Sequence, residues 1–335
     1  SKRGLGTSPL TCGGERWLAK RTINRGHPAA YGAHVVPRWY ADQLIRHGEE
    51  RSRVSMQATD GNRRLDIDLT LDGRTRKYRL NGKAKRPIEF EGVIPSVVFT
   101  PDDLDLVKGP NSGRRSSLDT LGAQVNKSYY TVRRDYEKVI RHKNRLLKEE
   151  ADVALGAINE MIVTVGAQLT IYRIALFERL LPHLTAKYQE ISQGRDCLNA
   201  VYVLVGKGAP EETVEPYPRR SPRGVGPARF MSVRRKSGGA AGMVGPHSDE
   251  IVFTLDGENA SIYGSQGQQR SIVLSYKLAE AAVIEEIIEQ KPVLLLDDVM
   301  SELDGRRRDA LVTAMEGGSQ TFITTANIDY FNEAC

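Results

Sequence analysis

The spacing of hydrophobic residues changes along the chain, and each spacing predicts a different kind of structure. Between residues 53 and 100 apolar and polar residues alternate, which is typical of half-buried β-strands. Three turn signals separate the alternating runs: Asp60-Gly61, Asp72-Gly73 and Asn81-Gly82. Because such dipeptides favour tight turns, this region is predicted to form antiparallel hairpins, followed by a more buried strand from Ile94 to Phe99.

Beyond Gly113 the apolar residues recur every three or four positions among many charges, which is the spacing of helices. A first run extends from Tyr129 to Leu146, and a second extends from Ile158 to Leu180. The pattern predicts paired long helices, either as a bundle around a local core or as an extended coiled coil. It lasts for only about three heptads, which favours the bundle.

The last third of the chain alternates between strand-like and helix-like segments. Residues 198–206 are predicted to form a strand, and the Pro-, Gly- and Arg-rich segment 207–244 is predicted to be an irregular connection. Four elements follow: a strand around Ile251 and Phe253, a helix from Ser271 to Glu289, and strands from Val293 to Leu296 and from Thr321 to Thr324. This order is typical of a parallel α/β sheet.

The composition is that of an ordinary globular chain. The 335 residues are 40% hydrophobic and 27% charged, which excludes a disordered tail and a collagen-like chain. There is no run of about 18 apolar residues, so we expect a cytoplasmic protein that does not enter a membrane. The cysteines are few and lack metal-ligand spacing, so free thiols are expected at Cys12, Cys197 and Cys335.

The positive charge is concentrated in two places. The net charge is +6, and residues 1–40 hold seven Lys or Arg against one acidic residue. A second basic run lies between Lys207 and Lys236 and contains three glutamates. Basic patches of this kind suit a polyanion, although a solvated loop explains the second run equally well.

One strand carries a candidate for chemistry at its end. The apolar run from Val293 to Leu296 is followed at once by Asp297 and Asp298. A buried strand that ends in two carboxylates places them at the edge where open α/β sheets bind ligands. One carboxylate can hold Mg²⁺ and the next can orient or deprotonate a water molecule, whereas the alternative is a strand that runs into an acidic turn.

A second segment strengthens the functional interpretation. The run Gly264-Ser265-Gln266-Gly267-Gln268-Gln269-Arg270 stands about 30 residues before the acidic pair and opens a helix. Its glycines permit close approach of the backbone, and Ser265 and the helix start offer donors to a phosphate. The segment Ser301-Glu302-Leu303-Asp304 follows the acidic pair. The combination is more specific than any one segment.

These motifs resemble those of the ABC-type ATPase head, and most closely the RecF family. The resemblance rests on SQGQQR, LLLDDVMSELD and TFITTAN, supported by LIRHGE, RLNGK, FTPDDLDLVKG, RRSSLD and GPHSDE. It covers about residues 41–206 and 245–333. It implies an α/β fold in which a mixed β-sheet lobe and a parallel α/β lobe carry an inserted helical arm domain.

The implied organisation has four parts. Residues 1–40 are an unassigned segment that does not resemble the family, and 41–113 form the β-rich N-terminal lobe of the head. Residues 114–197 form the helical arm, and 198–335 form the C-terminal lobe.

The resemblance also implies roles for individual residues. Ser265, Gly267 and Gln268 would form the signature motif, which touches the γ-phosphate of ATP held by the other subunit. Asp297 would be the Walker B magnesium ligand and Asp298 the catalytic carboxylate. Three positions complete the implied set: Ser301 and Asp304 in the D-loop at the dimer interface, and Thr324 or Thr325 at the switch position that senses the γ-phosphate.

The activity implied by the resemblance is ATP- and Mg²⁺-dependent. Two heads close on two ATP molecules, the homodimer clamps double-stranded DNA near single-strand to double-strand junctions, and slow hydrolysis opens it. The partners implied are RecO and RecR. The processes implied are DNA replication, recombinational repair and the SOS response, and the implied location is the nucleoid. The alternatives are a DNA-binding module of the same fold without ATPase activity, or an SMC-type head that serves chromosome structure.

The largest departure from the family concerns the phosphate loop. RecF-like proteins carry Gly-x-x-x-x-Gly-Lys-Thr-Asn near their start, but no Gly-Lys-Ser or Gly-Lys-Thr occurs in this chain. The residues Leu18 to Thr22 can be encoded by CTG GCA AAA CGA ACA, which gives Gly-Lys-Thr-Asn when read from its third base. We therefore hypothesise that the phosphate loop lies in another reading frame.

Two smaller features concern the GPHSDE stretch. Related sequences more often have an arginine at the position of Ser248, so a contact with phosphate or a carboxylate is weakened here. For His247 a structural or interface role is predicted in preference to that of a catalytic base, because no Ser or Cys partner is recognisable.

Overall fold

The computed structural model describes residues 45, 48–59, 64–73, 75–149, 155–206, 231–235, 245–297 and 299–324. The predicted N-terminal segment 1–40 and most of the basic run between Lys207 and Lys236 lie outside the described residues.

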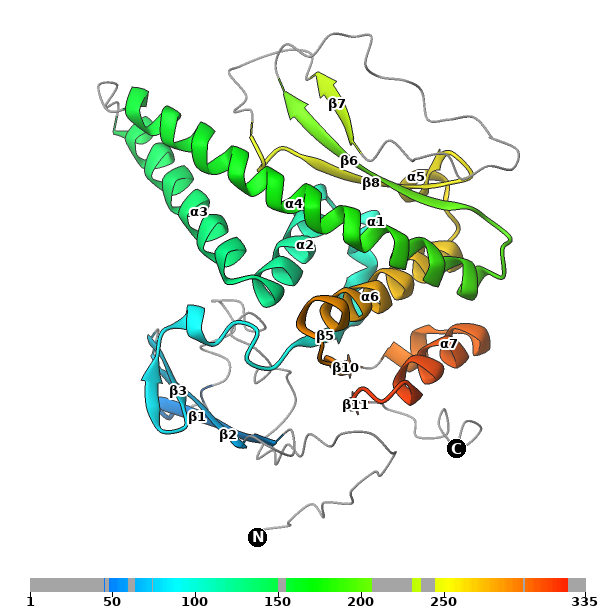
Figure 1. Cartoon of the computed structure of the whole chain (residues 1–335), viewed down its shortest axis with the longest axis horizontal. Coiled ribbons are helices and arrows are strands. Elements are labelled where there is room, and N and C mark those ends of the chain that lie inside the picture. The colour runs from blue at the N-terminus through cyan, green and yellow to red at the C-terminus, as the bar shows by residue number, and fades with distance from the viewer. Residues whose placement is uncertain are drawn as a thin grey trace.

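The first sheet is an antiparallel meander, as predicted. Its strands follow one another in chain order: β1 (Arg51–Thr59), β2 (Arg64–Asp72), β3 (Thr75–Leu80) and β4 (Lys83–Lys85) (Figure 1). The turn between β3 and β4 has φ of 51° at Asn81 and 75° at Gly82. Asn and Gly tolerate the left-handed region, so this dipeptide closes the hairpin.

The second sheet is parallel and has β10 (Val293–Asp297) at its centre. Its neighbours are β5 (Ser96–Phe99) and β11 (Thr321–Thr324). Successive side chains of β10 point to opposite faces, so Leu294 and Leu296 join the main core, whereas Val293 and Leu295 pack with residues of the meander. Both faces are covered, which explains why β10 is apolar throughout.

The third sheet corrects two predictions. Strand β8 (Glu250–Leu255) does not enter the parallel sheet but pairs antiparallel with β6 (Leu198–Gly206), and β5 is the strand that pairs with β10. Within segment 207–244, β7 (Met231–Arg235) forms a strand parallel to β6 instead of an irregular connection. The sheet is completed by β9 (Glu258–Asn259). Such pairings depend on tertiary contacts that periodicity does not report.

In the part of the chain that the structure describes, four α-helices and the 3-10 helix Pro101–Leu104 lie between β5 and β6. The α-helices are α1 (Asp105–Lys108), α2 (Asn111–Val125), α3 (Lys127–Lys148) and α4 (Leu155–Ser192). Helices α3 and α4 form a hairpin (Figure 1), and α4 also packs along α6 (Gln266–Ile288). At the corner between α2 and α3, the Tyr129 ring lies where a Cβ on Gly122 would be, so glycine allows this contact. The paired helices were predicted, and they belong to a bundle around the core.

Helix α4 is long and apolar enough over Gly156–Ser192 to cross a membrane by length and composition alone. A core helix of a soluble protein has the same properties, so this is weak support for a membrane span. Leu180 and Leu184 of α4 are fully buried in the main core, and Arg173 at its middle forms an ion pair with Asp119 of α2. This part of the helix therefore has the contacts of a core helix, whereas Met161, Val163 and Ile171 nearer its start are exposed.

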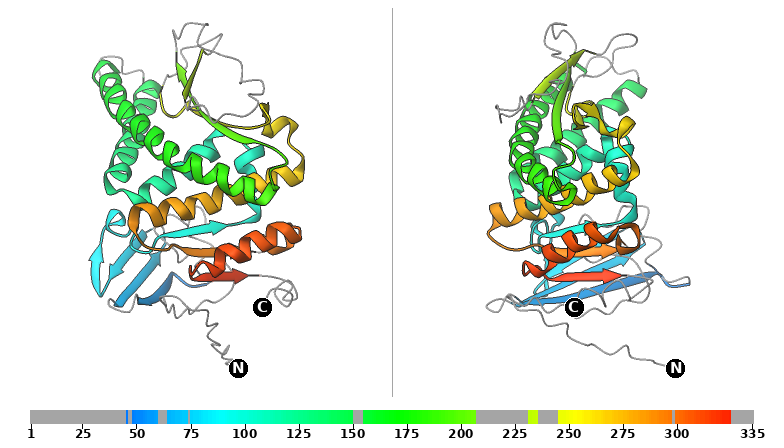
Figure 2. Two further views of the ribbon diagram at one scale, coloured as in Figure 1. Left: turned by 45° about the vertical axis from the view of Figure 1, so that its right-hand side comes forward. Right: turned by 90° about the vertical axis from the view of Figure 1, so that its right-hand side faces the viewer.

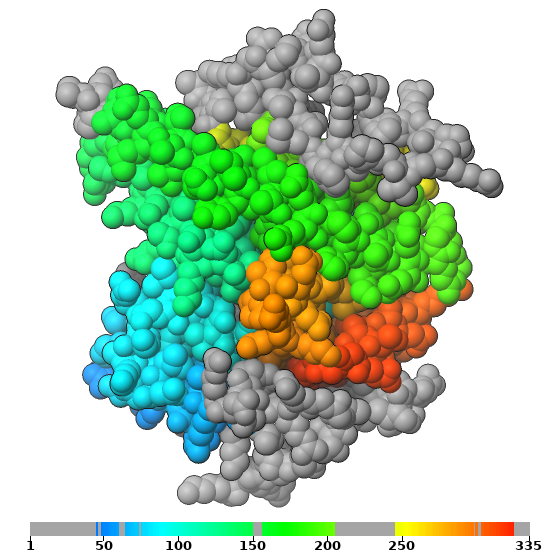
Figure 3. All heavy atoms as spheres, in the orientation of Figure 1, coloured from blue at the N-terminus to red at the C-terminus, as the bar shows by residue number. Residues whose placement is uncertain are grey.

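The elements stack in layers (Figure 2). The meander and the parallel sheet lie at one end, α6 and α7 (Gly305–Glu316) cover the parallel sheet, and the sheet of β6 and β8 lies at the other end beyond α4. One continuous core cluster joins residues of β5, β10, α2, α4, α6 and β8. In Figure 3 the end of α6 reaches the surface between α4 and α7.

Candidate functional site

The carboxyl edge of the parallel sheet carries two of the predicted site residues. Asp297 and Thr324 are the last residues of β10 and β11 and lie opposite each other in the register. The Thr324 hydroxyl donates a hydrogen bond to Asp297 Oδ1 at 2.5 Å. Asp298 and Thr325 follow directly but lie outside the described residues. The strand pairing thus brings together a carboxylate and a hydroxyl that are 27 positions apart.

The start of α6 carries three further predicted residues. Ser265 is the N-cap, and its hydroxyl accepts a hydrogen bond from the backbone N–H of Gln268 at 3.2 Å. In return, Gln268 Oε1 accepts from the backbone N–H of Ser265 at 2.8 Å. This capping box starts the helix at Gln266, five residues before the predicted start at Ser271. Ser265 is exposed, so the amino end of α6 faces solvent, where it can attract an anion.

Arg307 connects the start of α6 to the predicted D-loop. Its guanidinium donates hydrogen bonds to the Gly267 carbonyl at 2.5 Å and to Asp304 Oδ2 at 2.6 Å, and a third to the Ser271 hydroxyl at 2.9 Å. Asp304 is the N-cap of α7 and accepts from the Arg307 backbone N–H at 3.1 Å. No local pattern distinguishes Arg307 from its neighbours Arg306 and Arg308, so the sequence analysis did not identify it.

The side chain of Gln268 is fixed from the opposite side. Gln268 Nε2 donates to Asp196 Oδ2 at 2.9 Å, and the Tyr188 hydroxyl donates to the same oxygen at 3.1 Å. Burial, together with the neighbouring Asp196 carboxylate, raises the pKa of Tyr188, so its phenol stays protonated and remains a donor. The first turn of α6 is therefore held by residues of α4, of α7 and of the loop before β6.

Exposed apolar side chains lie beside this helix start. Ile262 and Tyr263, at the end of α5 (Ala260–Tyr263), are 68% and 69% exposed. They directly precede Gly264 and Ser265. Large apolar residues exposed next to a polar cluster are typical of a surface that meets another protein.

The predicted residues therefore fall into two groups. One group contains Asp297 and Thr324, and the other contains Ser265, Gly267, Gln268 and Asp304. Ser301 lies in the short 3-10 helix Val299–Glu302, but its side chain is not described. Within the described residues no three His, Cys, Asp or Glu side chains come together as a metal cluster. A magnesium ion bound to Asp297 would therefore take most of its ligands from water and phosphate, as Mg²⁺ commonly does.

Three of the stretches that support the family resemblance outside these motifs build a buried polar network. Arg114 donates to the carbonyls of Leu106, Val107 and Gly109 at 2.9, 3.2 and 3.1 Å. Arg115 donates to the carbonyl of Asp249. The RRSSLD stretch thus joins FTPDDLDLVKG to GPHSDE, which are far apart in the sequence. These hydrogen bonds hold α2 to α1 and to the loop that leads into β8.

His247 lies in this network rather than among the other candidate residues. Its Nδ1 is 2.5 Å from the hydroxyl of Tyr136 on α3, and the two rings are stacked with centroids 6.2 Å apart. This contact supports the structural role that the sequence predicted.

The parallel sheet, its covering helices and a capped Ser-x-Gly-Gln helix start define an ABC-type ATPase head. No family model matches the chain. The DNA replication and repair protein RecF of Symbiobacterium thermophilum is 36% identical over 294 residues, covering 85% of this chain and 76% of that protein. That of Rippkaea orientalis is 36% identical over 311 residues, covering 86% and 79%.

Solved structures agree with these relatives. The recombination mediator protein RecF of the RecFOR pathway, solved with ATP, matches with a TM-score of 0.69 and 25% identity, covering 86% of this chain and 78% of that chain. The chain belongs to the RecF family of DNA replication and repair proteins.

Proposed function

We propose that this chain binds ATP with Mg²⁺ at an interface between two copies of itself and that the resulting dimer closes on duplex DNA near single-strand to double-strand junctions. One solved relative is a complex of RecF with ATP, which supports ATP as the ligand. RecO and RecR are the proposed partners, since that relative acts in the RecFOR pathway. The proposed location is the cytoplasm, on the nucleoid.

The observation that carries this proposal is the connection made by Arg307. One side chain joins Gly267 of the signature motif to Asp304 of the D-loop. Exposed Ile262 and Tyr263 stand beside the same helix start. A polar cluster with an exposed anion-binding helix end and an apolar margin suits contact with a phosphate that a second head presents.

The proposal gives separate roles to the two groups of predicted site residues. Asp297, held by Thr324, would bind Mg²⁺, and Thr324 or Thr325 would sense the γ-phosphate. Asp298 would be the catalytic carboxylate. Ser265, Gly267 and Gln268 would contact the γ-phosphate of ATP on the opposite head, with Ser301 and Asp304 at the same interface. ATP supplies the binding free energy that favours the dimer over the monomer.

One observation favours a second candidate function. The chain contains no Gly-Lys-Ser or Gly-Lys-Thr, and residues 1–40, where the family carries its phosphate loop, lie outside the described residues. A head without a working phosphate loop would be a DNA-binding module that does not hydrolyse ATP. Sequencing the DNA that encodes Leu18 to Thr22 tests the reading-frame hypothesis, and codons other than CTG GCA AAA CGA ACA would end it.

The two functions differ in ATP turnover and in dimerisation. We expect the purified chain to bind Mg-ATP, to sediment as a dimer when it does, and to show turnover that duplex DNA stimulates. Asp298→Asn is expected to abolish turnover and to preserve the ATP-dependent dimer. DNA binding without any ATP binding would instead establish the second function.

A further inference from the structure

Helix α3 carries a concentration of positive charge that the sequence analysis did not single out. Its 22 residues contain eight Lys or Arg against two acidic residues, whereas residues 41–335 as a whole hold equal numbers of the two kinds. Six of the eight recur at spacings of seven, four, three, four and three residues: Lys127, Arg134, Lys138, Arg141, Arg145 and Lys148. These spacings place them on one face of the helix, which we call the α3 basic stripe.

The α3 basic stripe faces solvent along its whole length. All six side chains are exposed, while Tyr129, Tyr136 and Val139 on the opposite face are buried in the core. At a rise of about 1.5 Å per residue, the distance from Lys127 to Lys148 is about 32 Å. This is close to one turn of a DNA duplex, which is about 34–36 Å.

The cations of α3 differ in whether their side chains have partners. The two that lie outside the stripe both have one: Arg133 pairs with Glu137 at 3.0 Å, and Lys143 donates a hydrogen bond to Asn159 of α4 at 2.7 Å. Within the stripe, Arg141 lies 3.7 Å from Glu137. The side chains of the other five stripe cations make no hydrogen bond or ion pair with the residues that the structure describes. Unpaired charges repel one another, so a stripe of them is costly without a polyanion to neutralise it.

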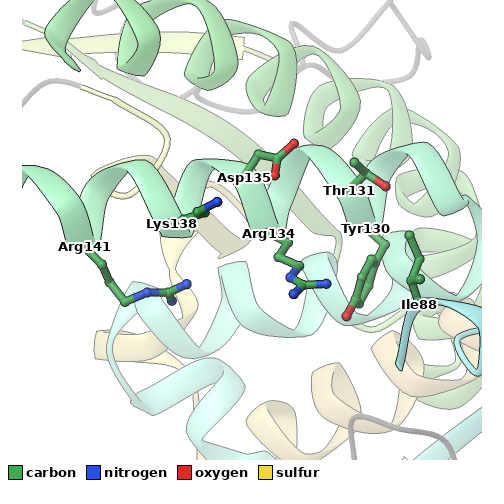
Figure 4. Close-up of a pocket in the computed structure, with 7 residues that line it drawn as sticks. All are labelled: Ile88, Tyr130, Thr131, Arg134, Asp135, Lys138 and Arg141. Carbon is green, nitrogen blue, oxygen red and sulfur yellow. The ribbon is translucent and has the colours of Figure 1, made fainter. Parts of the chain in front are cut away.

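A hollow of about 380 Å³ lies beside the stripe, between α3 and the turn Pro87–Glu89. Arg134, Arg141 and Tyr130 point to the same side of α3 in Figure 4, whereas Asp135, the acidic residue of the lining, points to the opposite side. Lys138 and Thr131 also line the hollow. The arrangement gives a cationic surface with a recess along residues 130–141, and the acidic group is turned away from Arg134 and Arg141.

We infer that the α3 basic stripe binds the phosphate backbone of duplex DNA. This inference rests on the proposed DNA-binding function and adds the site at which the duplex is held. A membrane surface suits the stripe less well, because a surface-bound helix inserts its apolar face and that of α3 is buried in the core. Backbone phosphates need only a row of cations without base-specific contacts, which is what the stripe provides.

The test is a variant of the full chain with Arg134→Gln, Lys138→Gln and Arg141→Gln. The matched control is Lys77→Gln, Arg79→Gln and Lys83→Gln, which removes three exposed cations from β3 and β4. Affinity for a labelled duplex is measured over a series of salt concentrations, with and without Mg-ATP. Thermal unfolding of both variants confirms that they fold: the stripe variant is expected to be at least as stable as the original chain, because it loses mutually repelling charges, and the control is expected to change little, because its cations are exposed.

The stripe variant is expected to lower the slope of log affinity against log salt by about 2.7, because each lost phosphate contact contributes about 0.9. Affinity at about 0.1 M salt should fall by roughly two orders of magnitude, and the control should keep the slope of the original chain. Equal losses in both variants, or an unchanged slope in the stripe variant, would overturn the inference while the proposed function stands. Failure of the original chain to bind duplex at any salt would overturn both.

A chemical measurement gives an independent result. Bound duplex is expected to protect Lys127 and Lys138 from acetylation in the full chain and to leave Lys77 as reactive as before. Protection of Lys77 without protection of the stripe lysines would place the DNA elsewhere.

Discussion

At the residue scale, Asp119 of α2 and Arg173 of α4 form a buried ion pair. Arg173 donates to the two carboxylate oxygens at 2.7 and 2.8 Å, and the Tyr129 hydroxyl donates to the same carboxylate at 2.7 Å. Both charged groups are buried. Pairing with Asp119 raises the pKa of Arg173, so the guanidinium stays charged despite its burial.

Asp119→Asn is therefore expected to lower the free energy of unfolding by about 3–5 kcal/mol, because it leaves the Arg173 charge buried without a counter-charge. Urea unfolding followed by circular dichroism measures the change. Asp72→Asn, which alters the two ion pairs that this residue makes with the exposed side chains of Arg51 and Lys77 in the meander, is the control and should have a much smaller effect. Equal effects of the two substitutions would show that the buried pair adds nothing to stability.

Buried tyrosines predict how stability depends on pH. Burial raises the pKa of Tyr136 to about 12. It also raises the pKa of five others: Tyr129, Tyr130, Tyr188, Tyr202 and Tyr276. Above pH 10, the usual value for tyrosine, the unfolded chain loses these protons while the folded chain keeps them. The free energy of unfolding should thus be insensitive to these groups below pH 10 and fall as pH rises beyond it.

The measurement is the absorbance of tyrosinate against pH. Tyr130 is half-buried and lines the hollow beside α3, so the expectation concerns the other five, which are buried. In the folded protein these five tyrosines are expected to ionise in one steep step that coincides with unfolding, whereas in urea they should titrate gradually around pH 10. Gradual ionisation in the folded protein would mean that the five side chains are open to water.

At the scale of elements, the start of α6 combines a local structural role with a proposed contact to phosphate. The two roles can be separated at Ser265. Ser265→Ala is expected to lower the free energy of unfolding by about 1 kcal/mol, since it removes the N-cap. Ser265→Asp keeps an N-cap acceptor and should retain the stability, but its negative charge would repel a γ-phosphate and abolish the ATP-dependent dimer.

Chemical unfolding and sedimentation with Mg-ATP give the two readouts for these variants. An ATP-dependent dimer that survives Ser265→Asp would show that the Ser265 hydroxyl faces no phosphate. Stability lost to the same extent in both variants would show that the cap itself is not satisfied by aspartate.

At the scale of the whole molecule, the core joins parts that the sequence assigned to different domains. Helix α2 runs through the predicted boundary between residues 113 and 114, and α4 packs along α6 of the C-terminal lobe. Leu180 of α4 and Ile284 of α6 are fully buried members of one core cluster. The base of the helical segment and the head should therefore unfold together.

Native-state hydrogen exchange tests this expectation. Amides of α4 near Leu180 and of α6 near Ile284 are expected to share one opening free energy, equal to that of global unfolding. Earlier opening of residues 155–192 alone would instead show that the helical segment is an independently unfolding domain.

The sequence by itself determined the features that depend on neighbouring residues. Asn81-Gly82 closes a hairpin because both residues tolerate positive φ, and Ser265 with Gln268 starts α6 because their side chains satisfy free N–H groups within one turn. The apolar run before Asp297 predicted a buried strand, which the structure contains as β10. The motifs at these positions also led to the correct family.

Only the tertiary structure decided which distant segments meet. The pairing of β5 with β10, the contact of Arg307 with Gly267 and the ion pair of Asp119 with Arg173 join residues up to about 200 positions apart, and no local pattern encodes them. The α3 basic stripe depends on both the sequence and the tertiary structure. Its spacing is present in the sequence, but packing of Tyr136 and Val139 into the core decided that the cations opposite them face solvent.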